Sequence, residues 1–164
     1  MQMIPLPTPG AYSLLIAPRE ALPGLFELAA GLALQAPLRV LDGGNVFNVY
    51  DLARALRRRV EDIQPALQRV ELARAFTCHQ MVMLIEEAAQ ARTPALVLDL
   101  LATFGDEGVR LHERLRLFTR ALTSLRQAGQ HAPLLVWARP NHGLTPGQSA
   151  PMLRALARYA GQVW

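Results

Sequence analysis

The sequence contains no lysine, because all 17 positions counted as lysine or arginine are arginine. This absence excludes Schiff-base catalysis and also the phosphate-binding loop of form G-x-x-x-x-G-K-[ST], since both need a lysine ammonium group. Cysteine is nearly absent as well. Cys78 has no second cysteine to pair with, so a disulfide framework is excluded and a reducing, cytoplasmic location is predicted.

Long apolar runs and metal-binding spacings are also missing. No stretch reaches the roughly 18 to 20 consecutive apolar residues that a membrane helix needs, so no membrane partner is expected. The spacing of the four histidines matches no metal-binding motif, and the sequence predicts no metal site. Residues 1–10 carry three prolines and no basic residue, which favours a short extended lead-in over a signal peptide.

What the chain does contain fits one globular domain over residues 1–164. Hydrophobic residues make up 51% of the 164 positions, which is enough for a single core. No internal repeat, low-complexity tract or linker divides the sequence. The formal net charge of +4 makes nucleic acid one candidate partner.

Short apolar runs alternate with segments of helical periodicity along the whole chain. The predicted strands are Tyr12–Ala17, Leu38–Leu41, Val70–Ala73, Ala95–Leu98 and Leu134–Ala138. The predicted helices are Ala21–Leu34, Val49–Arg59, Thr77–Ala91, Val109–Ala128 and Ser149–Ala160, the last with Ser149 as its N-cap. This alternation predicts an α/β fold with a mainly parallel sheet of about five strands flanked by helices.

Ligands of open parallel sheets bind at the carboxyl ends of the strands, so four loops should converge into a site. These loops are 17–24, 42–47, 99–107 and 139–147. The strand Ala95–Leu98 followed by Asp99 has the form of a Walker B element, in which a carboxylate at the strand tip holds a metal ion through water. Taken alone, the pattern favours a structural role for Asp99, as a cap of the loop or of the next helix.

Two segments resemble the RadA-type recombinases of the RecA superfamily. The stretch Ala-Arg-Ala-Phe-Thr-Cys-His-Gln over residues 73–80 resembles that family's A-R-A-[FY]-x-x-x-H-Q. The stretch Val-Leu-Asp-Gly-Gly-Asn-Val-Phe over residues 40–47 is similar to its apolar-apolar-D-T-E-x-x-F. The resemblance covers roughly residues 12–139 and implies a RecA-like three-layer core.

The chain departs from this family where ATP hydrolysis is carried out. At the phosphate loop, residues 17–24 contain one glycine, no lysine and two prolines, and a proline has no backbone N–H to offer a phosphate. Gly44 stands where the family has its water-activating carboxylate, and Ala138-Arg139 stands where it has a polar N-Q. The resemblance therefore implies a remnant of a nucleotide site, made of Arg19, Asp42, Asn45, Asp99 and Arg139, without catalytic residues.

Two functions from different classes follow, with a third as a weaker alternative. The favoured one is a RecA-like module without ATP hydrolysis, with no cofactor and with ATP and magnesium not expected. It would bind another protein, such as a recombinase or replication factor, or a second copy of itself, in DNA recombination, repair or replication. The alternatives are a nucleotide-binding ATPase with a rebuilt phosphate loop, in which Arg19 and Asp99 replace the usual pair, and a small basic DNA-binding accessory protein.

Arginine rows supply candidate contacts to nucleic acid. Arg54, Arg57 and Arg58 share one face of a predicted helix, and Arg114 is expected on the polar side of the helix 109–128. A solvated charged face is the other interpretation of such rows. Phe76 and the other phenylalanines of the apolar runs are expected to pack in the core.

Overall fold

The computed structural model describes residues 7–140 and 144–164 of the chain. Predictions for residues 1–6 of the lead-in and for 141–143 of the last loop lie outside the described residues. The strands are β1 (Ser13–Ile16), β2 (Leu38–Asp42), β3 (Val70–Arg74), β4 (Ala95–Leu98), β5 (Leu134–Ala138) and β6 (Gln162–Val163). The helices are α1 (Leu22–Gln35), α2 (Val49–Arg57), α3 (Gln64–Gln68), α4 (Cys78–Ala91), α5 (Leu111–His131) and α6 (Pro146–Tyr159), with two short 3-10 helices, η1 (Arg19–Ala21) and η2 (Leu100–Gly105).

All paired strands run parallel in one sheet of order β3-β2-β4-β5-β1-β6. β4 and β5 are buried along their whole length, which explains why their sequences are continuous apolar runs rather than alternating ones. Parallel pairing requires each connection to cross back over the sheet, and helices carry these crossovers. The predicted α/β fold with a parallel sheet is thereby confirmed.

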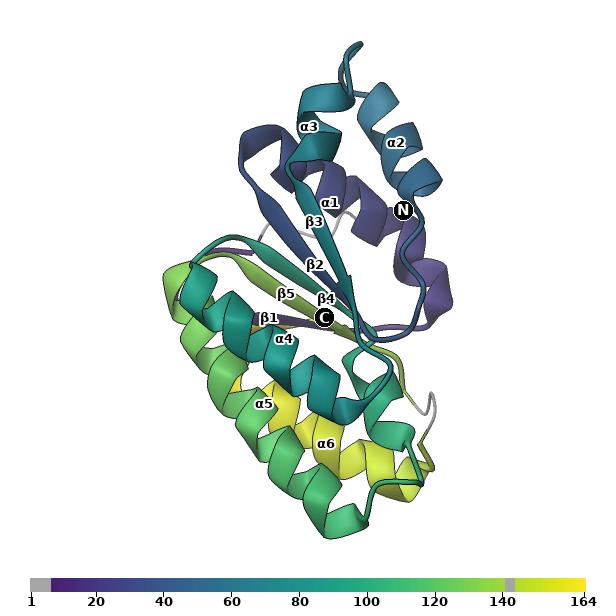
Figure 1. Ribbon diagram of the computed structural model, residues 1–164, viewed down its shortest axis with the longest axis vertical. Coiled ribbons are helices and arrows are strands. Elements are labelled where there is room, and N and C mark those ends of the chain that lie inside the picture. The colour runs from purple at the N-terminus through teal and green to yellow at the C-terminus, as the bar shows by residue number, and fades with distance from the viewer. Residues whose placement is uncertain (1–6, 141–143) are drawn as a thin grey trace.

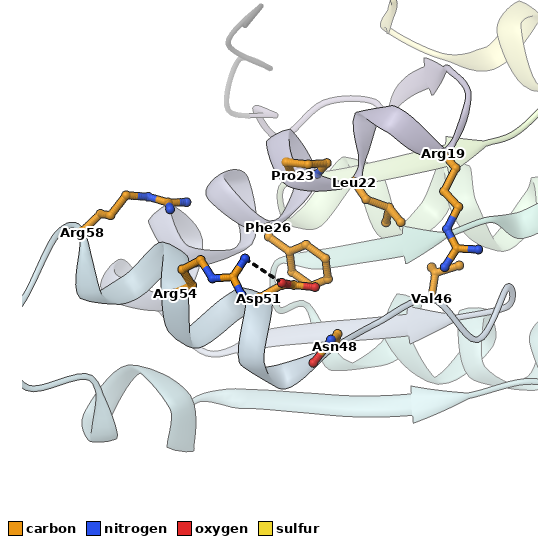
Figure 2. A pocket seen from close by; sticks show the side chains of 9 residues that line it. All are labelled: Arg19, Leu22, Pro23, Phe26, Val46, Asn48, Asp51, Arg54 and Arg58. Carbon is orange, nitrogen blue, oxygen red and sulfur yellow. Dashed lines mark ion pairs between the residues drawn. The ribbon is translucent and has the colours of Figure 1, made fainter.

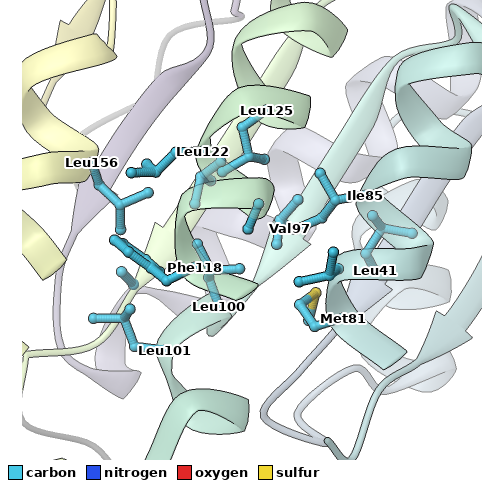
Figure 3. Packing of buried hydrophobic residues seen from close by; sticks show 14 of the residues in the cluster. Leu41, Met81, Ile85, Val97, Leu100, Leu101, Phe118, Leu122, Leu125 and Leu156 are labelled. Carbon is cyan, nitrogen blue, oxygen red and sulfur yellow. The ribbon is translucent and has the colours of Figure 1, made fainter. Parts of the chain in front are cut away.

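Helices cover both faces of the sheet and give three layers (Figure 1). α1, α2 and α3 lie on one face, and α4, α5 and α6 lie on the other. Each face has its own apolar cluster. Trp137 and Leu56 belong to the cluster under α1 and α2, whereas Phe118 and Leu125 belong to the one under α4, α5 and α6, which Figure 3 shows from close by. The three-layer arrangement agrees with the RecA-like core expected from the sequence.

Two differences from the prediction lie at the C-terminal end. The last helix starts at Pro146 rather than Ser149, because Gln148 reaches back to accept a hydrogen bond from the N–H of Thr145 at 3.1 Å, as in a capping box. A sixth strand, β6, pairs with β1 and was not predicted. It has only two residues, too few for a periodic pattern.

Phe76 was expected in the core, and this expectation is wrong. Its side chain is 67% exposed, just before the capping box that Thr77 and Gln80 form at the start of α4. Phe47, Phe104 and Phe118 are buried, as predicted. Among residues 7–140 and 144–164, none of the helices combines the length and the apolar character that crossing a membrane requires.

Candidate functional site at the carboxyl edge of the sheet

The predicted loops do converge at the carboxyl ends of the central strands. Gly43 donates its N–H to the carbonyl of Leu98 at 2.8 Å, which joins the loop after β2 to the end of β4. The indole N–H of Trp137 donates to the carbonyl of Ala17 at 2.9 Å, which joins β5 to the segment after β1. Strand order explains this convergence, because β2, β4, β5 and β1 are neighbours in the sheet.

The Walker-B-like carboxylate of Asp99 is held by an arginine of the same chain. The Nε of Arg139 donates to Oδ2 of Asp99 at 2.8 Å, and Nη2 of the same guanidinium contacts the same oxygen. The Asp99 side chain is fully buried, and that of Arg139 is 12% exposed. An ion pair sheltered from water is little screened. A divalent cation at Asp99 would therefore be repelled by the guanidinium or would have to displace it.

Gly44, which the resemblance to recombinases aligns with a catalytic carboxylate, packs directly against Asp99. A Cβ atom added at Gly44 would lie 2.5 Å from Oδ2 and 2.7 Å from Cβ of Asp99. Real Cβ atoms do not approach other atoms so closely, and the buried aspartate has no room to yield. Any side chain at this position would push the loop away from β4 and open the ion pair.

Asp42 closes its own loop. Its two carboxylate oxygens accept hydrogen bonds from the backbone N–H groups of Val46 at 3.1 Å and Phe47 at 2.9 Å. Nε of Arg74 lies 3.6 Å from the same carboxylate, which is fully buried. Asn45, between these donors, is exposed and has a φ of 51°, a left-handed conformation that asparagine adopts more readily than most residues.

The segment in the place of the phosphate loop is a short 3-10 turn that leads directly into α1. Ala21 donates its N–H to the carbonyl of Pro18 at 3.1 Å, and Ala17 donates to the carbonyl of Ala138 at 3.4 Å. Pro18 and Pro23 have no N–H to offer. The Ala21 amide thus closes the turn and the Ala17 amide continues the pairing of β1 with β5, so neither is directed at an anion. The Arg19 side chain is exposed to solvent.

Arg19 lines a groove between the start of α1 and the start of α2, which Figure 2 shows. We name it the α1–α2 groove. It has a volume of about 320 Å³, and its residues are Arg19, Leu22, Pro23, Phe26, Val46, Asn48, Asp51, Arg54 and Arg58. Apolar side chains and guanidinium groups thus share one cavity.

The arginines of the α1–α2 groove differ in their partners. Arg54 lies 3.5 Å from Asp51, and Arg58 contacts the carboxylate of Glu27, whose pKa this hydrogen bond lowers. In the described part of the chain, Arg19 has neither a hydrogen bond nor an ion pair through its side chain. The sequence did not single out the apolar residues Leu22 and Phe26 as site residues, because their spacing only marks the buried side of a helix.

The predicted nucleic-acid arginines fall into two groups. Arg54, Arg57 and Arg58 are exposed near the end of α2, as expected. Arg114 is not on a solvent-facing surface, and its prediction as a contact is wrong. Its side chain is buried, with Nη1 donating to the carbonyl of Phe104 at 3.0 Å, so it holds the end of η2 against α5.

The strand tips thus bring together Asp42, Gly44, Asp99 and Arg139, while Arg19 and Asn45 face solvent. Of the three polar side chains at this edge, Asp99 and Arg139 pair with each other, and Asp42 accepts hydrogen bonds from the backbone of its own loop. Among known proteins, neither a family model nor a curated protein matches the sequence.

Proposed function

We propose that this chain is a RecA-like domain that has lost ATP hydrolysis and acts by binding another protein. One observation carries the first half of the proposal. The carboxylate in the Walker B position, Asp99, is buried and paired with Arg139, and the backbone of Gly44 fills the space beside it.

Phosphoryl transfer needs a cradle for the phosphates, a bound cation and a group that positions the attacking water. In this chain the carboxylate of Asp99, which would hold the cation, is paired with the Arg139 guanidinium instead. No side chain can be added at Gly44 to position water, and the amides of Ala17 and Ala21 already donate to the carbonyls of Ala138 and Pro18. Loss of each group costs orders of magnitude in rate, so the three together support a non-hydrolytic role.

The α1–α2 groove supports the second half, protein association. Its apolar side chains suit an apolar anchor, and the exposed Arg19 suits a carboxylate next to that anchor. We therefore assign the groove to an acidic segment of another protein that carries an apolar side chain. The resemblance to recombinases suggests DNA recombination, repair or replication as the setting.

The loss of nucleotide chemistry is tested by thermal shift and by phosphate release, each with ATP and magnesium, in the presence and absence of DNA. We expect no change in melting temperature and no phosphate above the buffer blank. A bound nucleotide at 100 times its Kd would instead stabilise the protein by about 2.7 kcal/mol. Magnesium-dependent turnover that disappears in Asp99→Ala would overturn the proposal and favour the rebuilt ATPase.

Association is tested by selecting from a random peptide library on the purified protein. We expect enrichment of peptides in which an apolar residue adjoins aspartate or glutamate, and loss of this enrichment in Arg19→Glu. The control is Arg110→Glu, because Arg110 is exposed and lies outside the groove. No enrichment, or equal loss in both variants, would remove the groove as the docking site, and a dimer in sedimentation would point to self-association.

A further inference from the structure

A second groove lies between α5 and α6, away from the carboxyl edge of the sheet. It has a volume of about 430 Å³. Both helices run side by side on the same face of the sheet in Figure 1. We name it the basic groove, lined by Thr119, Leu122, Thr123, Arg126, Arg154, Ala155, Arg158 and Tyr159. None of these residues is acidic, whereas Asp51 lines the α1–α2 groove.

The absence of acidic residues from the basic groove follows from the distribution of charge along the sequence. From Arg114 to the end of the printed chain there is no aspartate or glutamate, although seven arginines occur there. Four of the seven have partners in the fold. Arg116 pairs with Glu113, Arg120 with Glu86 and Arg139 with Asp99, while Arg114 is buried against a carbonyl.

The other three arginines, Arg126, Arg154 and Arg158, all line the basic groove. Within the described residues, none of them forms an ion pair with a carboxylate. All three are exposed, so each guanidinium is available to an anion from solution. Three uncompensated charges in one cavity raise the local positive potential, because a groove focuses the field of the groups that line it.

An aromatic ring holds two of these guanidinium groups in place. The Cζ of Arg126 lies 4.6 Å from the centre of the Tyr159 ring, and that of Arg158 lies 5.7 Å from it. Both distances are within the range of cation–π attraction. Arg154 and Arg158 are four residues apart on α6 and therefore project from the same side of the helix. The cluster is thus organised from two helices before any ligand arrives.

We propose that the basic groove binds the phosphate backbone of single-stranded nucleic acid. A positively charged groove with aromatic and guanidinium surfaces is the chemistry that binds single strands without sequence preference. The arginines at the end of α2 are poorer candidates, because Arg54 and Arg58 already have carboxylate partners and only Arg57 is without an ion pair among the described residues. The inference is independent of the proposed protein association, which uses the opposite face of the sheet.

Fluorescence anisotropy with a labelled oligothymidylate of about 20 nucleotides, titrated over a range of salt concentrations, tests this proposal. If all three arginines contact phosphates, the logarithm of the binding constant should fall with the logarithm of salt concentration with a slope of about −2. Arg154→Gln with Arg158→Gln should reduce this slope by about 1.4 units in magnitude and weaken binding at low salt by about tenfold or more. Arg126→Gln, on the other helix, should weaken binding as well.

A closely matched control is Arg116→Gln with Arg120→Gln. These residues are also arginines four apart on an exposed helix face, and their loss changes the net charge equally, but both have carboxylate partners outside the groove. Binding by this variant should stay within about twofold of the unsubstituted protein, apart from the general effect of net charge. Equal losses in the two double variants, no binding by the unsubstituted protein, or binding to anionic phospholipid vesicles but not to the oligonucleotide would each overturn the proposal.

Discussion

At the scale of the residue, the pair formed by Asp99 and Arg139 determines what the carboxyl edge of the sheet can do. Asp99 has a φ of 54°, a left-handed conformation that aims its carboxylate back toward the end of β5. A buried carboxylate needs a compensating charge, and the guanidinium of Arg139, the residue directly after the neighbouring strand β5, supplies it. The ion pair that stabilises the fold thus also opposes the binding of a metal ion at the Asp99 carboxylate.

Breaking this pair should cost stability. We expect Asp99→Asn to lower the free energy of unfolding by about 3–5 kcal/mol, because it leaves the Arg139 guanidinium buried without a counter-charge. Urea denaturation followed by circular dichroism measures the change. The control is Glu71→Gln, which breaks a surface pair with Arg39 and should cost less than about 1 kcal/mol. Unchanged stability in Asp99→Asn would mean that the carboxylate is held for a ligand instead.

Sequence reasoning located the site residues better than it located their partners. Asp42, Asp99 and Arg139 could be placed at strand tips, because each directly follows or ends an apolar run. That Asp99 meets Arg139 depends on β4 and β5 being neighbours, which a single sequence does not state. Arg114 was misplaced because its position on the helix says nothing of the carbonyl of Phe104, which draws its guanidinium inward.

At the scale of the element, a glycine in α5 allows this helix to pack closely against the backbone that leads into β1. A Cβ atom added at Gly129 would lie 2.4 Å from the backbone N of Tyr12 and 2.8 Å from the carbonyl carbon of Ala11. Gly10 also donates its N–H to the carbonyl of Gly129 at 2.8 Å. Backbone atoms cannot turn aside as a side chain can, so this close approach needs a residue without a side chain.

Gly129→Ala should therefore destabilise the protein although alanine favours a helix. The gain in helix propensity is about 1 kcal/mol. Displacing α5 from the start of β1 costs about 1–3 kcal/mol and commonly more when backbone must move. We expect a net loss of stability in thermal or urea denaturation.

Gly31→Ala in α1 is the matched control for this prediction. An added Cβ there meets the end of the flexible Arg59 side chain at 3.2 Å, which can move aside. This substitution should leave stability unchanged or raise it by up to about 1 kcal/mol. A stabilised Gly129→Ala would show that α5 is not seated against β1 as described.

Most elements could be predicted from periodicity, and the exceptions are short or lie at element ends. α3 has five residues and β6 has two, so neither contains a full repeat of its pattern. The start of α6 was placed at Ser149, a common N-cap residue, but Ser149 is buried inside the helix. Thr145-Pro146 followed by Gln148 is the stronger start signal, because proline suits the first helical position and glutamine completes a capping box.

At the scale of the whole molecule, the sheet separates two apolar clusters that share its strands. Leu56 is fully buried in the cluster under α1 and α2, and Leu125 is fully buried in the one under α5. The strands β1, β2, β4 and β5 each contribute side chains to both clusters, because successive residues of a strand point to opposite faces. Loss of packing on one face should therefore weaken the other.

We expect the protein to unfold in a single transition even when one layer is weakened. Leu56→Ala and Leu125→Ala should each lower the free energy of unfolding by about 2–5 kcal/mol. In a Trp164→Phe background, fluorescence of the buried Trp137 reports one layer, and far-ultraviolet circular dichroism reports the helices of both. The two signals should change at the same urea concentration. Separate midpoints would show that the layers unfold independently and would contradict the prediction of one domain over residues 1–164.

The position of β1 in the sheet has a consequence for biosynthesis. Of the six strands, β1 leaves the ribosome before the others, yet both of its neighbours in the sheet, β5 and β6, leave after the rest. At ordinary rates of translation this interval is on the order of ten seconds. Throughout it the apolar segment Ser13–Ile16 has no native hydrogen-bonding partner, and a chaperone that shields the nascent chain should raise the yield of the protein.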